Sequence, residues 1–149
     1  MGDQKYVVFR VANELFGLPI GVVERILPAQ RTTRVPHMPP MIIGVFSLRG
    51  ETIAAVDMRM RFDLEASVRD GSFVVFLSGA DRVALKVDGV DGILTFSKSD
   101  IDSKCDFLRD KQDDFLAGVA RNGEERVVLL EPDNLLPAHV RTQAAALAA

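Results

Sequence analysis

Few side chains in this 149-residue sequence stand at spacings that suggest catalysis. The two histidines, His37 and His139, lie far apart in the chain, and neither has a carboxylate or a nucleophile at the spacing of a catalytic motif. A Ser-His-Asp triad assembles in space, so sequence order alone does not exclude one. We nevertheless expect His37 to be a solvated residue of a proline-rich loop and His139 to lie near a frayed end. The prediction is that the protein is not an enzyme and has no catalytic residue.

The acidic stretch from Asp100 to Asp114 does not satisfy the requirements of a calcium site. An EF-hand loop beginning at Asp100 would need an oxygen ligand at its fifth position and a glutamate at its twelfth. Those positions carry Lys104 and Lys111, so the stretch is better explained as a solvated loop or a short helix. Cys105 is the only cysteine, which excludes an intrachain disulfide and a cysteine-based zinc site. The sequence predicts no metal.

The glycine-containing segment Asp88–Gly92 is not a phosphate-binding loop, because no Lys-Ser/Thr pair follows it. Glycine tolerates positive φ, so the segment favours a turn or a β-bulge between strands. We therefore predict no cofactor.

The composition disfavours a nucleic-acid-binding module. Small barrels that bind nucleic acid need basic grooves and stacking aromatic side chains. Here 18 Lys and Arg residues stand against 21 Asp and Glu residues, for a net charge of −3, and there is no Trp and only one Tyr. The chain is 48% apolar and 26% charged, which is typical of a folded globular protein.

No segment predicts a membrane span or a secretory leader. The longest uncharged stretch, Val35–Leu48, is broken by prolines and is shorter than the roughly 20 residues that a spanning helix needs. Arg10, Asn13 and Glu14 interrupt the first apolar stretch, unlike the core of a signal peptide. We expect a soluble, cytoplasmic protein.

An internal repeat predicts two related halves. Tyr6–Leu27 aligns without a gap to Phe73–Leu94 at an offset of 67, with seven identical positions. Both segments are rich in Val, Ile and Phe and contain turn-forming residues, which is typical of a strand–turn–strand unit. Chance similarity between two β-hairpins is the alternative explanation.

The remaining pattern predicts mainly short strands. We expect further strands at Ile42–Ser47, Thr52–Asp57, Phe115–Ala120 and Arg126–Leu130, and an ordered loop at the proline-containing segment Gln30–Pro40. Short helical candidates are Asp57–Phe62, with Asp57 as N-cap, Pro132–Leu136, and the Ala-rich His139–Ala149. Many strands and few helices predict an all-β barrel or sandwich.

Arg49 is the polar residue that stands out among apolar strands. It precedes Gly50 at a predicted hairpin tip between two apolar runs. It could be an ordinary solvent-facing arginine, or its planar guanidinium could contact a partner through two hydrogen bonds. Spacing alone does not decide between these two explanations.

The same region resembles the signature of the CheW family, GVxNLRGxxxPVVDLR, through Ile42–Gly50, Ile53 and Val56-Asp57-Met58. Further blocks that resemble the family, in order, are Tyr6–Phe9, Phe16–Ile20 with Val23 and Ile26, Val87–Val90, Gly118–Leu130 and Leu135-Leu136. The resemblance implies an all-β, CheW-like fold of two SH3-like five-stranded β-barrel subdomains with a few short helices. Residues 1–149 would form a single CheW-like domain, divided near residues 63–72, and the fold allows strand exchange between the two subdomains.

The resemblance also implies a non-enzymatic adaptor without a cofactor. Its partners would be the cytoplasmic hairpin tip of a methyl-accepting chemotaxis receptor and the regulatory domain of a CheA-type histidine kinase. It would meet the membrane only indirectly, through receptors, and would not bind nucleic acid. The positions that match the family's receptor-binding residues are Val23, Ile26, Gly44, Leu48, Arg49 and Gly50. The resemblance does not assign kinase-binding residues to positions of this sequence.

The sequence departs from the family pattern at Ser47, at Ala55 and, most clearly, at the charged pair in Val23-Glu24-Arg25-Ile26. The family commonly reads Val-Arg-Glu-Val, so the charges of Glu24 and Arg25 are reversed. Because strand side chains alternate between faces, Arg25 would point where a carboxylate is normal and could face Arg49. The reversal favours a different receptor class, or an adaptor of a non-flagellar array in pilus motility, biofilm formation or development.

Overall fold

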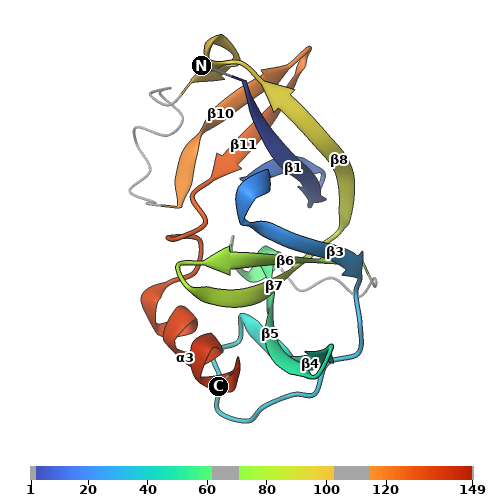
Figure 1. Ribbon diagram of the computed structural model, residues 1–149, viewed down its shortest axis with the longest axis vertical. Coiled ribbons are helices and arrows are strands. Elements are labelled where there is room, and N and C mark those ends of the chain that lie inside the picture. Colours follow the sequence, from blue (N-terminus) through green and yellow to red (C-terminus); the bar gives the residue numbers. More distant parts are fainter. Residues whose placement is uncertain (1–2, 62–70, 103–114, 149) are drawn as a thin grey trace.

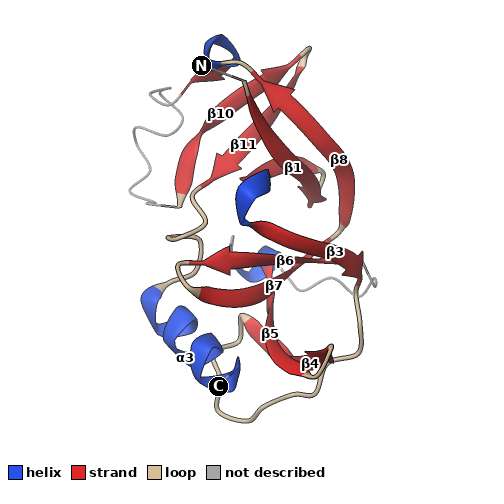
Figure 2. Ribbon diagram, viewed as in Figure 1, coloured by secondary structure: helices blue, strands red, loops and turns tan. Residues whose placement is uncertain are grey.

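The computed structural model describes residues 3–61, 71–102 and 115–148, which form two β-sheets and few helices (Figures 1 and 2). The predicted all-β class is confirmed. In chain order the elements are β1 (Gln4–Val11), β2 (Glu14–Pro19), the 3-10 helix η1 (Ile20–Val22), β3 (Val23–Pro28), β4 (Ile42–Leu48), β5 (Glu51–Asp57), α1 (Met58–Arg61), β6 (Ser72–Ser78), β7 (Asp81–Val87), β8 (Gly89–Phe96), the 3-10 helix η2 (Lys98–Asp100), β9 (Ile101–Asp102), β10 (Leu116–Asn122), β11 (Glu125–Leu130) and α3 (Ala138–Ala148).

Each half of the chain contributes one strand to the other half's sheet. One sheet has the order β8-β1-β2-β11-β10-β9 and the other β3-β6-β7-β5-β4. β3 therefore leaves the β1–β2 hairpin to pair with β6, and β8 leaves the β6–β7 hairpin to pair with β1 (Figure 1). The second sheet has the five strands that the resemblance implies, whereas the first has a sixth, β9, of two residues. The capping box of η2, formed by Ser97 and Asp100, leads the chain into this extra strand.

The two sheets repeat each other in detail. The sequence repeat forms β1–β2–β3 and then β6–β7–β8, so the predicted strand–turn–strand units are confirmed. The later hairpins β4–β5 and β10–β11 also correspond, at an offset of 74 (116 minus 42). Even the β-bulges match: the unpaired residues are Glu24 and Asp91 in the exchanged strands, and Ile43 and Ala117 in the hairpins. A bulge re-aims the residues beside it.

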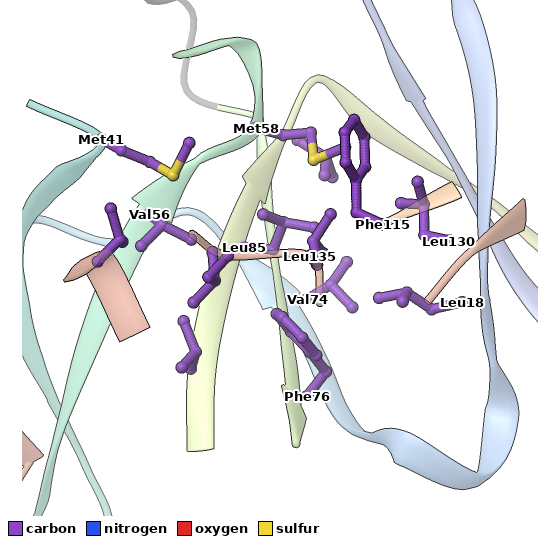
Figure 3. Packing of buried hydrophobic residues seen from close by; sticks show 14 of the residues in the cluster. Leu18, Met41, Val56, Met58, Val74, Phe76, Leu85, Phe115, Leu130 and Leu135 are labelled. Carbon is purple, nitrogen blue, oxygen red and sulfur yellow. The ribbon is translucent and has the colours of Figure 1, made fainter. Parts of the chain in front are cut away.

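Buried side chains form three apolar cores. The largest, which we call the central core, joins both sheets and helix α3; Figure 3 shows its members Leu18, Val74 and Leu85 together. The second, on the other face of the six-stranded sheet, includes Val8 and Leu129. The third, which we call the Phe46 core, lies on the other face of the five-stranded sheet and consists of Phe46, Ile53, Ala55, Phe73, Val75 and Ala84.

The central strands β1 and β6 are buried on both faces rather than alternating between core and solvent. In β1, Val8 packs in one core and Phe9 in another. In β6, Val75 and Phe76 divide in the same way. Each sheet is therefore covered on both sides, which explains why these strands are continuous apolar runs.

The helical predictions are confirmed in two of three places. Asp57 caps α1, since its Oδ1 accepts the Arg59 N–H at 3.0 Å. The Ala-rich segment forms α3, which packs against β5 through residues that include Val140 and Ala144 (Figure 2). The prediction of a helix at Pro132–Leu136 is wrong, because the segment forms turns. The Ser78 hydroxyl donates to the Pro132 carbonyl, and this long-range bond holds the segment against the β6–β7 turn.

Several predictions concern residues outside the described part of the chain. Cys105, most of the acidic stretch from Asp100 to Asp114, and most of the predicted division at residues 63–72 lie there. Among the described residues, no helix is both long and apolar enough to cross a membrane.

Candidate partner-binding surface

Arg49 and Gly50 form the two-residue turn between β4 and β5. Both have positive φ, 52° and 82°, as the tight turns of β-hairpins require. The flanking residues Leu48 and Glu51 are paired across the hairpin. Positive φ is unfavourable for a residue with a Cβ, so the arginine occupies a position that glycine or asparagine would fill with less strain. Its side chain is exposed and has no ion-pair partner among the described residues.

Gly44 is buried where the preceding loop crosses strand β4. A Cβ at this position would lie 2.6 Å from the Thr33 carbonyl oxygen, and its φ is +150°. Thr33 pairs with Val45 by two backbone hydrogen bonds of 2.7 and 2.9 Å. Gly44 therefore allows the ordered loop Gln30–Pro40 to pack against the hairpin that carries Arg49.

Strand β3 places the charge-reversed pair at a bulge. Glu24 is the bulged residue, and Arg25 is the cross-strand neighbour of Val75. Because directly paired side chains lie on the same face, Arg25 is on the face of the Phe46 core, where it is half-buried. Ile26 points to the opposite side and is 43% exposed, a high value for a large apolar residue.

The predicted receptor-binding residues do not all lie on one face. Val23 packs against the central core, whereas Leu48 packs against the Phe46 core. Leu27 of β3 packs against the same Phe46 core as Leu48, although β3 and β4 are the two outer strands of the sheet. The sheet is therefore rolled, which brings the end of β3 near the β4–β5 hairpin.

Arg82 of β7 links these two elements. Its Nε and Nη2 donate to the two carboxylate oxygens of Glu24 at 2.7 and 3.1 Å, and its Nη1 donates to Glu51. The guanidinium thus joins the bulge of β3 to the residue that follows the Arg49 turn. We use the name Arg82 surface for Arg82, its partners Glu24 and Glu51, and the nearby residues of the same two segments, Arg25, Leu48 and Arg49.

The electrostatics of the Arg82 surface follow from this arrangement. The hydrogen bond from Arg82 lowers the pKa of Glu24, although partial burial opposes the shift. A lowered folded-state pKa stabilises the fold above the ordinary carboxyl pKa, and this contribution is lost as the pH falls. Because the Glu24 and Arg82 side chains are 34% and 38% exposed, the stabilisation is small. The pair mainly orients side chains.

A hollow of about 410 Å³ lies beside this surface, between β5, the β6–β7 turn and α3. Glu51, Asp81, Arg82 and Ala145 contribute to its lining, together with apolar side chains such as Leu77. Of the two carboxylates that contact Arg82, Glu51 lines the hollow, and Glu24 is also partly exposed to solvent. No group of three or more His, Cys, Asp or Glu side chains in the described ranges could hold a metal ion.

Sequence reasoning found Arg49, Glu24 and Arg25 but missed Arg82 and Glu51. The repeat contained a usable signal, because Arg82 aligns with Leu15, a residue 6% exposed in the other sheet. A charged residue that aligns in the repeat with a core leucine marks a position where the two halves diverge. The receptor-contact role of the matched residues stays a prediction.

These features define a duplicated all-β domain whose two sheets exchange strands and whose hairpin turn presents an arginine. The chain belongs to the CheW-like domain family, whose model matches residues 5–139. The resemblance found in the sequence is therefore confirmed.

Individual relatives agree with this assignment. The chain is 30% identical over 145 residues to "Chemotaxis protein CheW" of Rhizobium meliloti, covering 96% of this chain and 94% of the relative. It is 29% identical over 135 residues to "Chemotaxis protein CheW" of Klebsiella aerogenes, covering 89% and 81%. Its fold is similar to the crystal structure of scaffolding protein TtCheW from Thermoanaerobacter tengcongensis, with a TM-score of 0.82, 23% identity, and coverage of 92% and 94%.

Proposed function

We propose that this chain is a non-enzymatic cytoplasmic adaptor that couples the hairpin tip of a chemoreceptor to the regulatory domain of a CheA-type histidine kinase. Membership of the CheW-like domain family and relatives named as chemotaxis proteins support this role. An adaptor needs preformed surfaces with an apolar centre and a few orienting polar groups, and needs no catalytic chemistry.

The proposal rests mainly on the exposure and the backbone conformation of Arg49. Its guanidinium is exposed and has no acceptor within the described part of the chain, although it stands at a backbone position with φ of 52°. The corresponding turn of the other sheet has Gly123, with φ of 65°, at the same place. Strained non-glycine residues that persist at an exposed site suggest a functional reason for the side chain. Hydrogen bonding to carboxylates or backbone carbonyls of a receptor helix is such a reason.

Coupling requires more than simultaneous binding. A receptor can change kinase activity through an adaptor only if the assembled complex binds the two kinase states with different affinities. Two sheets that share strands and one central core transmit a displacement as one body, because packed cores deform little. The proposal therefore predicts that the chain acts on the kinase only in the presence of receptor.

The test measures kinase autophosphorylation with a receptor hairpin fragment, in the presence and absence of this chain. We expect receptor control of the kinase only when the chain is added. Arg49→Ala should weaken receptor binding by about 1–3 kcal/mol, the range for losing a hydrogen bond to a charged group. Calorimetry with the receptor fragment measures this loss, and thermal unfolding should be almost unchanged.

Arg121→Ala is the matched control, because Arg121 is an exposed arginine of the other hairpin, β10–β11. It should leave receptor binding unchanged. Receptor affinity that is equal in the wild-type, Arg49→Ala and Arg121→Ala proteins would show that Arg49 is not a contact. Absence of binding to every receptor and kinase fragment would overturn the proposed function.

A further inference from the structure

The Arg82 surface contains more cationic than anionic groups, and its anionic groups are already engaged. Both carboxylates, Glu24 and Glu51, hydrogen-bond to the single guanidinium of Arg82. Arg25 and Arg49 have no ion pair with any residue that the structure describes. Two cations at this site therefore have no counter-charge within residues 3–61, 71–102 and 115–148.

Arg25 and Arg49 belong to the two backbone segments that Arg82 joins. Arg25 follows Glu24 directly in the chain, and Arg49 is two residues before Glu51. Because one guanidinium contacts both carboxylates, the backbone segments that carry Arg25 and Arg49 converge on it. Arg25 is half-buried on the face of the Phe46 core, and a long arginine side chain at such a position can cover apolar surface with its stem while its charge stays in solvent.

The equivalent position in the other half shows that the fold does not require this arginine. In strand β8 the bulged acid Asp91 is bound by Arg10 at 2.8 Å, as Glu24 is bound by Arg82. The next residue there is Gly92, where β3 has Arg25. Gly92 has a φ of +130°, which Arg25 does not share, but the exchanged strand and its bulged acid are present in both halves, so the fold itself does not require a cation at this position.

We propose that Arg25 and Arg49 together select a partner by its carboxylates: an acidic helical segment whose Asp or Glu side chains reach both guanidinium groups. This inference rests on the proposed function and specifies the receptor segment that binds at the same site. A neutral or basic segment is rejected there, because it would leave two arginines without acceptors or add a third like charge. Arg82 keeps Glu24 and Glu51 away from the two free cations and so preserves the site for the partner's carboxylates.

The experiment uses the full chain and receptor hairpin fragments that bind the wild-type protein. Arg25→Glu and Arg49→Glu are measured separately by calorimetry at two salt concentrations. Each should weaken binding by about tenfold or more, the loss expected for a charge-assisted contact. Each should also reduce the salt dependence of the affinity, because one screened attraction has been removed. Arg121→Glu, with the same charge change on the other sheet, should alter affinity by less than about twofold.

Reciprocal substitutions separate recognition from a structural effect. Changing the partner's Asp and Glu residues near its tip to Lys, one at a time, should weaken binding to the wild-type chain. One such change should restore binding to the Arg25→Glu protein, which no loss of folding could produce. Thermal unfolding of each variant, and binding of the kinase regulatory fragment, check that the rest of the molecule is intact.

Three results would overturn the inference. Hairpin fragments that bind the wild-type and both Glu variants equally would leave the proposed function standing and exclude acidic selection. A receptor segment that binds the Glu variants more tightly would indicate a basic partner. If no hairpin fragment binds the wild-type chain, the proposed function fails and the inference fails with it.

Discussion

The ends of the two rolled sheets differ in one side chain that changes their chemistry. In the six-stranded sheet Leu15 is 6% exposed and closes its core with an apolar group. The aligned residue of the five-stranded sheet is Arg82, whose side chain is 38% exposed and contacts two carboxylates. Equivalent positions of the two sheets therefore hold an apolar side chain, Leu15, in one sheet and an ion-paired side chain, Arg82, in the other. Only the second leaves charged groups exposed at this place.

The exchanged strands β3 and β8 show what the duplication retains. Each has a bulged acidic residue bound by an arginine, and each exposes an isoleucine two positions later, Ile26 and Ile93. The shared features set the bulge and the strand crossing. The two halves differ where Arg25 aligns with Gly92 and where Arg49 aligns with Gly123. In both places the residue of the five-stranded sheet is an arginine that has no ion-pair partner among the described residues. Duplication thus specifies the scaffold, and function is expected where the copies diverge.

The largest effect should come from the matched phenylalanines Phe9 and Phe76. Both are fully buried in the central core and lie at equivalent positions of the repeat. Truncation of either to Ala should lower the free energy of unfolding by about 3–5 kcal/mol, measured by urea denaturation. Phe9 also stacks on Phe16 with ring centroids 6.2 Å apart, so Phe9→Ala should be the more damaging by about 0.5–1.5 kcal/mol. If one of the two variants were nearly as stable as wild type, the repeats would not be equivalent in packing.

A smaller effect separates Gly44 from Gly92. Both have positive φ, +150° and +130°, but a Cβ at Gly44 would meet the Thr33 carbonyl oxygen, whereas a Cβ at Gly92 would meet nothing within 4 Å. Gly92→Ala tests backbone strain alone and should cost about 1–2 kcal/mol. Gly44→Ala adds a clash and should cost about 2–4 kcal/mol in the same denaturation experiment. Equal losses would mean that the loop at Thr33 moves aside freely.

The sequence predicted the parts of the fold that depend on local pattern. Val- and Phe-rich runs became strands, and Asp57 became the N-cap of α1. The turns at Pro132–Leu136 were missed because a hydroxyl from Ser78, far away in the chain, helps to fix that segment. The alternation of apolar and polar residues along a strand indicates which side chains are buried, but it does not indicate how the sheet curves.

The candidate surface was therefore only half predictable. Arg49 and the Glu24-Arg25 pair stand next to recognisable motifs, so sequence reasoning reached them. Arg82 lies in an unremarkable strand, and its role depends on the rolled sheet bringing β3, β5 and β7 together. No local pattern encodes such a convergence.

The smallest effect concerns the strand ends at Asp57 and Glu131, which also correspond. Their backbone N–H groups donate to the carbonyls of Met41 and Phe115 at 2.9 and 2.8 Å. Asp57 is 2% exposed and its Oδ2 has no hydrogen-bond partner among the described residues, whereas Glu131 is only half-buried. Burial raises the pKa of Asp57, although the Arg59 N–H and nearby cations oppose the shift. The folded state therefore binds the proton more tightly than the unfolded state does.

The sign of the pH effect follows from this difference. As the pH rises from the ordinary pKa of an aspartate to the raised folded-state value, the folded state retains a proton that the unfolded state has lost. The contribution of Asp57 to stability must decrease between these two pKa values and stay low above them. Asp57→Asn keeps an acceptor for the Arg59 N–H and removes the charge, so its stability relative to wild type should increase with pH across the same range.

Asp57→Ala provides the control, since it removes the charge and the cap together. Its stability should run parallel to that of Asp57→Asn at every pH, lower by about 1 kcal/mol for the lost N-cap. Urea denaturation of the three proteins at a series of pH values measures both differences, and the other carboxyl groups cancel because they are common to all. A stability difference between Asp57→Asn and wild type that does not change with pH would mean that Asp57 is ionised in the folded state as readily as in the unfolded chain. Its burial would then be compensated by Lys86, Arg59 or solvent, and the two strand ends would be alike in charge as well as in backbone geometry.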